Sequence, residues 1–332
     1  MQTTNKVLMV RPVRFAFNEE TAANNAFQVK TESEQQAQMI QQQAVTEFDN
    51  YVQLLRDNGI EVEVLQDTEE PFTPDSIFPN NCFSTHIEKN PLTEQDERTL
   101  VLYPMFAPNR RKERTKLLKV LGKMPFQKII DITGYEKEEK FLEGTGSLIL
   151  DREHRLAFAC ASPRTNEDVL DKWAAKTNYD YFLFKAEDEN GTPIYHTNVM
   201  MHIGTRFAVV CLDSVTDINE RERLIELLEE NDKEIVEISF EQMHQFAGNM
   251  LELHAGNNAA SGSNSSNCKT PASKAKASAP RKLLIMSATA KRSLTEEQIA
   301  LLEEDVTIVA PELTAIETAG GGSARCMLAE LY

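Results

Sequence analysis

A short segment that occurs five times along this 332-residue chain constrains its fold more than any other feature. In each copy a polar residue or a glycine pair directly precedes an apolar, strand-like run. The copies span residues 79–83, 143–149, 196–200, 247–251 and 324–328, and they align on Asn81, Gly146, Asn198, Asn249 and Arg325. The aligned positions are 65, 52, 51 and 76 residues apart by subtraction. Five unequal copies of one β/α unit predict a closed ring in which equivalent turns meet at a common axis.

The segments between these copies alternate between strand-like and helix-like patterns, which is typical of an α/β protein. Apolar residues at helical spacing predict an amphipathic helix over residues 32–58. Further helices are expected over residues 109–121, 166–176, 219–231 and 296–302. Buried strands are expected at 7–10, 99–103, 155–160 and 206–211. Thr165 before Asp168, and Thr295 before Gln298, indicate where two of the helices begin.

The charge of the chain limits its partners. With 35 basic and 52 acidic residues the formal charge is −17, which repels phosphate backbones and anionic lipids. We therefore expect neither nucleic acid nor a membrane as a partner. We expect a small-molecule ligand, and the sequence leaves the choice between a monomer and a homodimer open.

The cysteine pattern indicates a reducing compartment. The five cysteines are widely separated, odd in number and contain no C-x-x-C pair. Neither a disulfide framework nor a metal site is expected, and the histidines other than His196 lack metal-ligand spacing. The first residues lead directly into a short strand-like run without a signal peptide or an apolar span, so a cytoplasmic location is expected.

Residues 255–280 differ from the rest of the chain because they are rich in Asn, Ser, Ala and Lys and lack apolar periodicity. Such a composition cannot bury enough apolar surface to order itself. We interpret this stretch as a disordered insertion in a single domain that covers residues 1–332.

A single cysteine near the end of the chain is the first candidate for chemistry. Gly320, Gly321 and Gly322 precede Cys326, which lies at a turn before the last apolar run. A glycine run permits close approach of a backbone or substrate, and a cysteine at a turn is accessible to reaction. Cys326 is therefore a candidate nucleophile, although most isolated cysteines are small buried core residues.

Four motifs together resemble the amidinotransferase and arginine deiminase-like superfamily, which modifies guanidino and ureido groups on the pentein fold. They are residues 75–81 (DSIFPNN), 143–146 (EGTG), 196–198 (HTN) and 320–327 (GGGSARCM). The stretch from Arg11 to Gln28 is most similar to the citrulline-utilisation hydrolases of that superfamily. The resemblance implies a pentein α/β propeller of five ββαβ units around a central axis and a reaction that needs no cofactor.

The chemistry of this superfamily suits the residue types found here. A ureido or guanidino carbon is a poor electrophile, so a thiolate, here Cys326, is the appropriate nucleophile. His196 suits a role as the acid and then the base, because an imidazole titrates near neutral pH. Glu143 would orient the imidazole and stabilise its cation. The resemblance also implies that Asp75 binds substrate, at its α-amino end.

Two asparagines depart from the superfamily's pattern. In members that bind a guanidinium, the positions of Asn81 and Asn198 resemble aspartates. Two amides would leave a guanidinium without a counter-charge, but they can both donate to and accept from a neutral ureido group. We therefore expect a hydrolase that cleaves the ureido C–N bond of citrulline, giving ornithine, ammonia and carbon dioxide.

Several alternatives remain open at this point. The same catalytic residues serve arginine deiminases, dimethylarginine hydrolases and amidinotransferases, and the ring fold also occurs in a non-catalytic binding protein. Arg11, Arg14 and Arg325 are candidates to bind the substrate carboxylate. The basic cluster of Arg110 to Lys112 with Arg114 is expected to be a solvated helix face.

Overall fold

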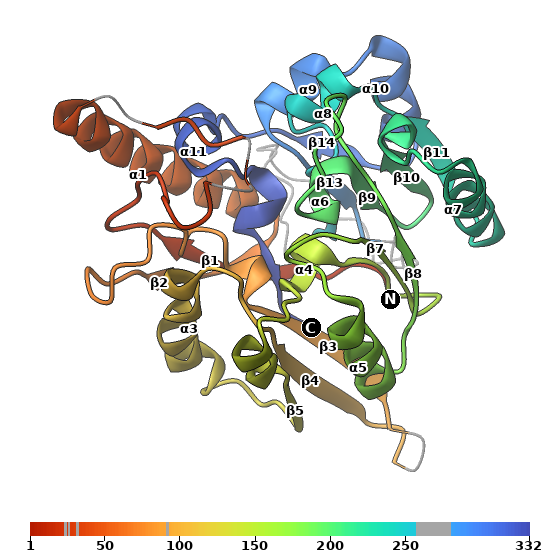
Figure 1. Cartoon of the computed structure of the whole chain (residues 1–332), viewed down its shortest axis with the longest axis horizontal. Coiled ribbons are helices and arrows are strands. Elements are labelled where there is room, and N and C mark those ends of the chain that lie inside the picture. Colours follow the sequence, from red (N-terminus) through yellow and green to blue (C-terminus); the bar gives the residue numbers. More distant parts are fainter. Residues whose placement is uncertain (23–24, 26, 31–32, 91–92, 257–279) are drawn as a thin grey trace, which may run out of the picture.

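The computed structural model describes residues 1–22, 25, 27–30, 33–90, 93–256 and 280–332 (Figure 1). Most of the sequence-predicted insertion at 255–280, including Cys268, lies outside the described residues. No helix in the described part of the chain is both long enough and apolar enough to span a membrane.

In the part of the chain that the structure describes, the strands form five sheets of three strands each, and these sheets share one plan. The middle strand pairs antiparallel with the first strand and parallel with the third. Four sheets are contiguous in sequence: β3 (Phe83–Lys89), β4 (Asp96–Leu102) and β5 (Lys128–Asp131); β6 (Ile149–Asp151), β7 (Leu156–Cys160) and β8 (Asp180–Phe184); β9 (Met201–Ile203), β10 (Phe207–Val210) and β11 (Glu234–Glu237); and β12 (Leu251–His254), β13 (Lys282–Ile285) and β14 (Thr307–Val309).

The fifth sheet joins the two ends of the chain. It consists of β15 (Ala329–Glu330), β1 (Lys6–Arg11) and β2 (Glu61–Gln66). β15 pairs antiparallel with β1 through Val7 opposite Glu330 and Leu8 opposite Ala329. The last strand therefore occupies the position that the first strand has in each of the other sheets.

Helices connect the second and third strands of every sheet, as parallel pairing requires. They are α1 (Glu34–Asp57), α2 (Pro108–Arg111) with α3 (Glu113–Leu121), α5 (Glu167–Thr177), α7 (Ile218–Glu230), and α9 (Ala288–Ser293) with α10 (Glu296–Glu303). In Figure 1 the long helices α1, α3, α5 and α7 lie at the periphery of the molecule. Four of the five predicted helices are thus confirmed within two residues at each end, whereas the one predicted over 109–121 is two helices, α2 and α3, divided at Lys112.

Helix caps agree with the sequence in one of the two predicted cases. Thr295 and Gln298 form a capping box at the start of α10, because each side chain bonds the backbone N–H of the other residue. At α5, however, Asn166 is the N-cap and accepts from the N–H of Asp168. Thr165 instead lies one residue before the cap, and its backbone N–H bonds the carbonyl of Ser162.

A one-turn segment precedes the first strand of each sheet, at the positions that the five sequence copies predict. These segments are the 3-10 turn η1 (Pro79–Asn81), α4 (Gly144–Ser147), α6 (Thr197–Met200), the stretch 248–250 and the 3-10 turn η4 (Ala324–Met327). α4 contacts both η1 and α6, and η1 contacts η4. Asn249 bonds the carbonyl of Asn198 and the N–H of Arg325. Each of the five turns therefore touches two others, which brings residues from all parts of the chain together.

Candidate active site

Cys326 lies in η4 and is buried, with 7% of its surface exposed. Its sulfur accepts from two amides, Asn249 Nδ2 at 3.3 Å and Asn198 Nδ2 at 3.5 Å. The orientation of Asn249 is determined by its other bonds, because Oδ1 accepts from the N–H of Arg325 at 3.0 Å and Nδ2 donates to the carbonyl of Asn198. Two N–H donors directed at sulfur stabilise a thiolate.

His196 and Glu143 form a buried pair. His196 is the residue before α6, Glu143 is the residue before α4, and His196 Nε2 lies 2.8 Å from Glu143 Oε2. Glu143 also accepts from the N–H of Phe106 at 2.9 Å and lies 3.4 Å from Nη1 of Arg164. The carboxylate is therefore held on three sides.

The charges around this pair set its protonation. Burial favours the neutral acid of Glu143, but Arg164 and His196 outweigh burial and hold the pKa of Glu143 well below its usual range. Burial lowers the pKa of His196 to about 4, even though Glu143 opposes the shift. At neutral pH the pair is thus a carboxylate and a neutral imidazole. Because an ionised carboxylate can only accept, His196 donates from Nε2–H and keeps the lone pair on Nδ1.

The two glycines of the EGTG motif are required for close contacts. Gly144 has a φ of +46°, and a Cβ there would lie 2.4 Å from the carbonyl oxygen of Asn80. A Cβ on Gly146 would lie 2.3 Å from Asn81 Nδ2 and 2.9 Å from His196 Nδ1. The basic nitrogen of the imidazole and the amide of Asn81 therefore both lie next to the space that a side chain at position 146 would fill.

Asn81 is oriented by a buried arginine. Arg110 Nη1 donates to Asn81 Oδ1 at 2.7 Å, and the same guanidinium bonds both carboxylate oxygens of Glu113. Asn81 Nδ2 and Asn198 Oδ1 are both buried, and neither has a hydrogen-bond partner in the described part of the chain. One amide donor and one amide acceptor thus remain free at positions 81 and 198, where the sequence has asparagine instead of the aspartates of guanidinium-binding members.

Asp75 lies beside this group. Its Oδ2 accepts from Asn18 at 2.7 Å and Thr21 at 3.3 Å and is 4.0 Å from Arg110, while its Oδ1 has no partner. Burial raises the pKa of Asp75, although Arg110 and Asn18 favour the ionised form. A carboxyl group with one free, buried oxygen can bind a ligand.

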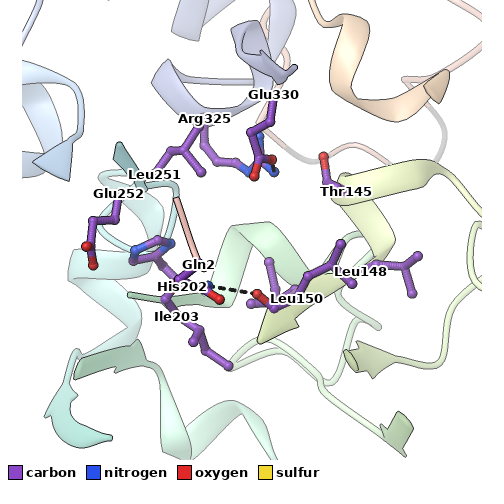
Figure 2. A pocket seen from close by; sticks show the side chains of 11 residues that line it. Gln2, Thr145, Leu148, Leu150, His202, Ile203, Leu251, Glu252, Arg325 and Glu330 are labelled. Carbon is purple, nitrogen blue, oxygen red and sulfur yellow. Dashed lines mark hydrogen bonds and ion pairs between the residues drawn. The ribbon is translucent and has the colours of Figure 1, made fainter. Parts of the chain in front are cut away.

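The three arginines proposed for the substrate carboxylate are engaged elsewhere. Arg11 pairs with Asp49 and Arg14 with Glu70, both on the exposed surface. Arg325 directs its guanidinium to Glu330, at 2.7 Å, and to the carbonyl of Leu328. Figure 2 shows Arg325 and Glu330 in a separate small cavity that Thr145 and His202 also line. Only the backbone N–H of Arg325 reaches the group around Cys326.

The expectation of a solvated face for the basic cluster is wrong for Arg110, which is 2% exposed and lies among Asp75, Asn81 and Glu113. The sequence also predicts no place in the site for Arg164 or Asn249. Position 249 aligns with Asn81 and Asn198 in the five copies, so the repeat was the signal that could have identified it. No comparable sequence signal marks Arg110 or Arg164, because their burial depends on distant segments.

The glycine run before Cys326 was expected to permit close approach of a backbone or substrate, but side chains of this chain pack against it. The ring of Phe78 lies against Gly320 and Gly322, and a Cβ on Gly320 would lie 2.7 Å from its edge. Asn25 and Gln28 bond the carbonyl of Gly320. The run is therefore packed by other parts of this chain. Among the described residues, no group of three or more His, Cys, Asp or Glu is arranged to hold a metal ion.

The five small β-sheets, with helices between the second and third strand of each, and the family match given next show the class: the pentein hydrolases that modify guanidino groups. Residues 11–332 match the family model described as "N,N dimethylarginine dimethylhydrolase, eukaryotic", and the chain belongs to that family. It is thus a hydrolase that acts on non-peptide C–N bonds. No curated protein matches the sequence.

Solved structures agree with this fold at low sequence identity. The N-terminal domain of ArgZ, an arginine dihydrolase of the ornithine–ammonia cycle in Cyanobacteria, was solved with its substrate; it is 16% identical, with a TM-score of 0.68 over 97% of this chain and 96% of that one. AgrE with L-arginine is 16% identical, with a TM-score of 0.68 over 97% of this chain and 39% of that one. A dimethylarginine dimethylaminohydrolase adduct with S-methyl-L-thiocitrulline is 13% identical, with a TM-score of 0.62 over 99% of this chain and all of that one.

Proposed function

We propose that this hydrolase cleaves the ureido group of a small amino acid, with citrulline as its substrate. The observation that carries the proposal is the pair of buried, unpartnered amide atoms, Asn81 Nδ2 and Asn198 Oδ1. A ureido group has a carbonyl oxygen that accepts and N–H groups that donate, so it satisfies both atoms at once.

A guanidinium fits this pair less well. It carries only donors and a positive charge, so Asn81 Nδ2 would face a cation and stay unpartnered. Rotating the amide does not help, because Arg110 would then face the NH2 group of Asn81. A buried polar group left without a partner costs about 1–3 kcal/mol, which is a factor of roughly 10–100 in binding.

The proposed first step joins Cys326 to the ureido carbon. The thiol proton passes to Nδ1 of His196, the S–C bond forms, and the C–N bond to the leaving amine breaks as His196 protonates that amine. Asn198 and Asn249 stabilise the thiolate before attack. Glu143 stabilises the imidazolium while it exists.

In the second step water completes the hydrolysis. His196, neutral again, takes a proton from water, the oxygen bonds the carbonyl carbon, and the S–C bond breaks with the electron pair returning to sulfur. The sum is citrulline and water giving ornithine and carbamate, which decomposes to ammonia and carbon dioxide. Catalysis requires Cys326 and His196 to flank one carbon atom.

We also propose that the five sheets surround a common axis as a pentein propeller in one domain, residues 1–332, since the contacts among the turns support it.

Hydrolysis of a guanidino group is the second candidate. It is favoured by Asp75, whose buried Oδ1 is an acceptor without a partner and offers a counter-charge for a cation. One of the solved structures named above is AgrE bound to L-arginine.

Release of the amine product separates these candidates: ammonia from citrulline, arginine and agmatine, and dimethylamine from dimethylarginine. We expect turnover of citrulline that disappears in Cys326→Ser and survives in Cys211→Ala, a buried cysteine outside the site. Turnover of arginine with none of citrulline would reject the ureido proposal. A product that forms only when an acceptor amine such as glycine is added would show an amidinotransferase.

A further inference from the structure

A second polar cavity, of 370 Å³, lies away from the residues proposed for catalysis. Its lining includes His86 and Lys89 on β3, Arg152 and Arg155 between β6 and β7, and the aromatic rings of Tyr179 and Tyr332. None of the catalytic side chains lines it. Any ligand bound there would therefore be separate from the substrate.

A buried chain of hydrogen bonds determines the tautomer of His86. Trp173 Nε1 lies 2.9 Å from the Tyr103 hydroxyl, that hydroxyl lies 2.7 Å from Ser84 Oγ, and Ser84 Oγ lies 2.8 Å from His86 Nε2. The indole can only donate, so Tyr103 accepts from it and donates onward to Ser84. The Ser84 hydrogen then points to His86 Nε2. In this arrangement every hydroxyl hydrogen has an acceptor, and the proton of His86 is on Nδ1.

The Nδ1–H group of His86 has no acceptor among the residues that the structure describes. His86 is 4% exposed, and its Nδ1 is buried without a hydrogen-bond partner. Burial, together with the nearby Arg152, holds the pKa of His86 well below its usual range, so the ring is neutral. A buried donor without a partner is costly, and His86 is one of the residues that line the cavity.

The arginines of the cavity are held in place by the protein. Arg152 stacks on Tyr332 at 4.2 Å and donates to Glu330 at 3.1 Å and to the carbonyl of Thr85 at 3.2 Å. Arg155 stacks on Tyr179 at 5.6 Å and donates from Nη1 to Glu88 at 2.5 Å and to the carbonyl of Thr177 at 3.4 Å. Each guanidinium has further N–H groups beyond those used in these bonds. Three basic side chains line the cavity, and each pairs with a carboxylate: Arg152 with Glu330, Arg155 with Glu88 and Lys89 with Asp96.

We propose that this cavity binds a small oxyanion, a carboxylate or a phosphate group, through His86 Nδ1–H and the guanidinium of Arg152, with Arg155 adding positive charge. Oxyanions accept from fixed N–H donors and are attracted by arginine, which matches what the cavity presents. A binding site here goes beyond the proposed function and does not depend on it.

Nitrogen-15 NMR of the full chain tests the proposal directly. The His86 ring should show the neutral tautomer with its proton on Nδ1. Titration with inorganic phosphate, and in a second series with succinate, should shift that resonance in a saturable manner. The anion that binds more tightly identifies the group. A proton on Nε2, or no response of Nδ1 to either anion, would overturn the proposal.

Variants locate the bound anion. His86→Leu should abolish the saturable effect, and His86→Asn should keep part of it because its amide N–H can replace Nδ1–H. Arg155→Gln, at a partly exposed position, should weaken phosphate binding about tenfold and remains informative if His86→Leu does not fold. The matched control is His202→Asn. His202 is another buried histidine, but it lines the small cavity beside Arg325, so this variant should bind phosphate as the wild type does. Equal phosphate affinity in the wild type, His86→Leu and Arg155→Gln would place the anion elsewhere and refute the site.

Discussion

Arg110 donates from Nη1 to Oδ1 of Asn81 at 2.7 Å, and both side chains are buried. Since arginine cannot accept a hydrogen bond, this contact determines which end of the amide remains free. The free end is the NH2 group. Position 81 therefore presents a donor, which suits the carbonyl oxygen of the proposed ureido substrate, whereas a guanidinium has no acceptor to offer it.

Asn81→Asp should change substrate preference. The substitution retains a partner for Arg110 but replaces the free donor with a charged acceptor. We expect kcat/KM for citrulline to fall about 10–100-fold while the ratio of arginine to citrulline turnover rises. Steady-state kinetics with both substrates measure this. An equal fall for the two substrates would mean that Asn81 has only a structural role.

Gly146→Ala should impair catalysis without unfolding the protein. The added Cβ would lie 2.3 Å from Asn81 Nδ2 and 2.9 Å from His196 Nδ1, so both groups must move. Displacing a catalytic group by about 1 Å costs roughly 100-fold in rate. Gly134→Ala is the matched control, because a Cβ at Gly134 would have no neighbour within 4 Å. Wild-type kcat in Gly146→Ala would contradict the role assigned to this glycine.

Glu143→Gln should lower kcat by about 10³–10⁴, the scale known for removing the carboxylate that orients a catalytic histidine. The amide of this variant can still accept from His196, but it cannot offset the imidazolium charge, and Arg164 loses its ion pair with the carboxylate. Turnover of citrulline, with circular dichroism to verify folding, measures the effect. A loss smaller than tenfold would argue against the dyad.

The pH dependence of citrulline turnover should reflect the low pKa of His196. Because that pKa is about 4 in the folded protein, the imidazole stays neutral and kcat/KM should remain level from pH 7 down to about pH 5, then fall. An acid limb near pH 6.5 would show that the site does not depress this pKa.

The same shift affects stability in a defined direction. The unfolded chain protonates His196 near pH 6.5 and the folded chain near pH 4, so between these values the unfolded state binds more protons. The stability associated with this residue is complete above pH 6.5 and is lost as pH falls toward 4, by on the order of 3 kcal/mol. Urea unfolding of the wild type and His196→Gln across this range should show a shallower pH dependence in the variant.

Glu330→Gln should destabilise the fold by about 3–5 kcal/mol, because it leaves two buried guanidinium groups, Arg152 and Arg325, without their shared carboxylate. Glu312→Gln, which breaks an exposed pair with Arg292, is the control and should change little. Urea unfolding compares the two. Similar midpoints for both variants would refute the role of Glu330 as a buried anchor.

The local features were predictable because they depend on short-range chemistry. The capping box at Thr295, the apolar periodicity of the helix ending at Asp57 and the five turn segments are all readable from neighbouring residues. The superfamily followed from four short motifs whose order along the chain does not depend on tertiary contacts. For the same reason the sequence placed Glu143 and His196 at turns that precede strands.

Only the tertiary structure decided which side chains these turns bring together. Burial of Arg110 beside Asn81, the pairing of Arg164 with Glu143 and the bond from Asn249 to the Cys326 sulfur each join residues 21 to 77 positions apart. The sequence determined the units and the chemical groups that they carry, because propensity and periodicity act over a few residues. Burial placed the guanidinium of Arg110, and not that of Arg325, among the site residues. Burial and charges from distant segments also set the protonation of His196, and both exist only after the chain has folded.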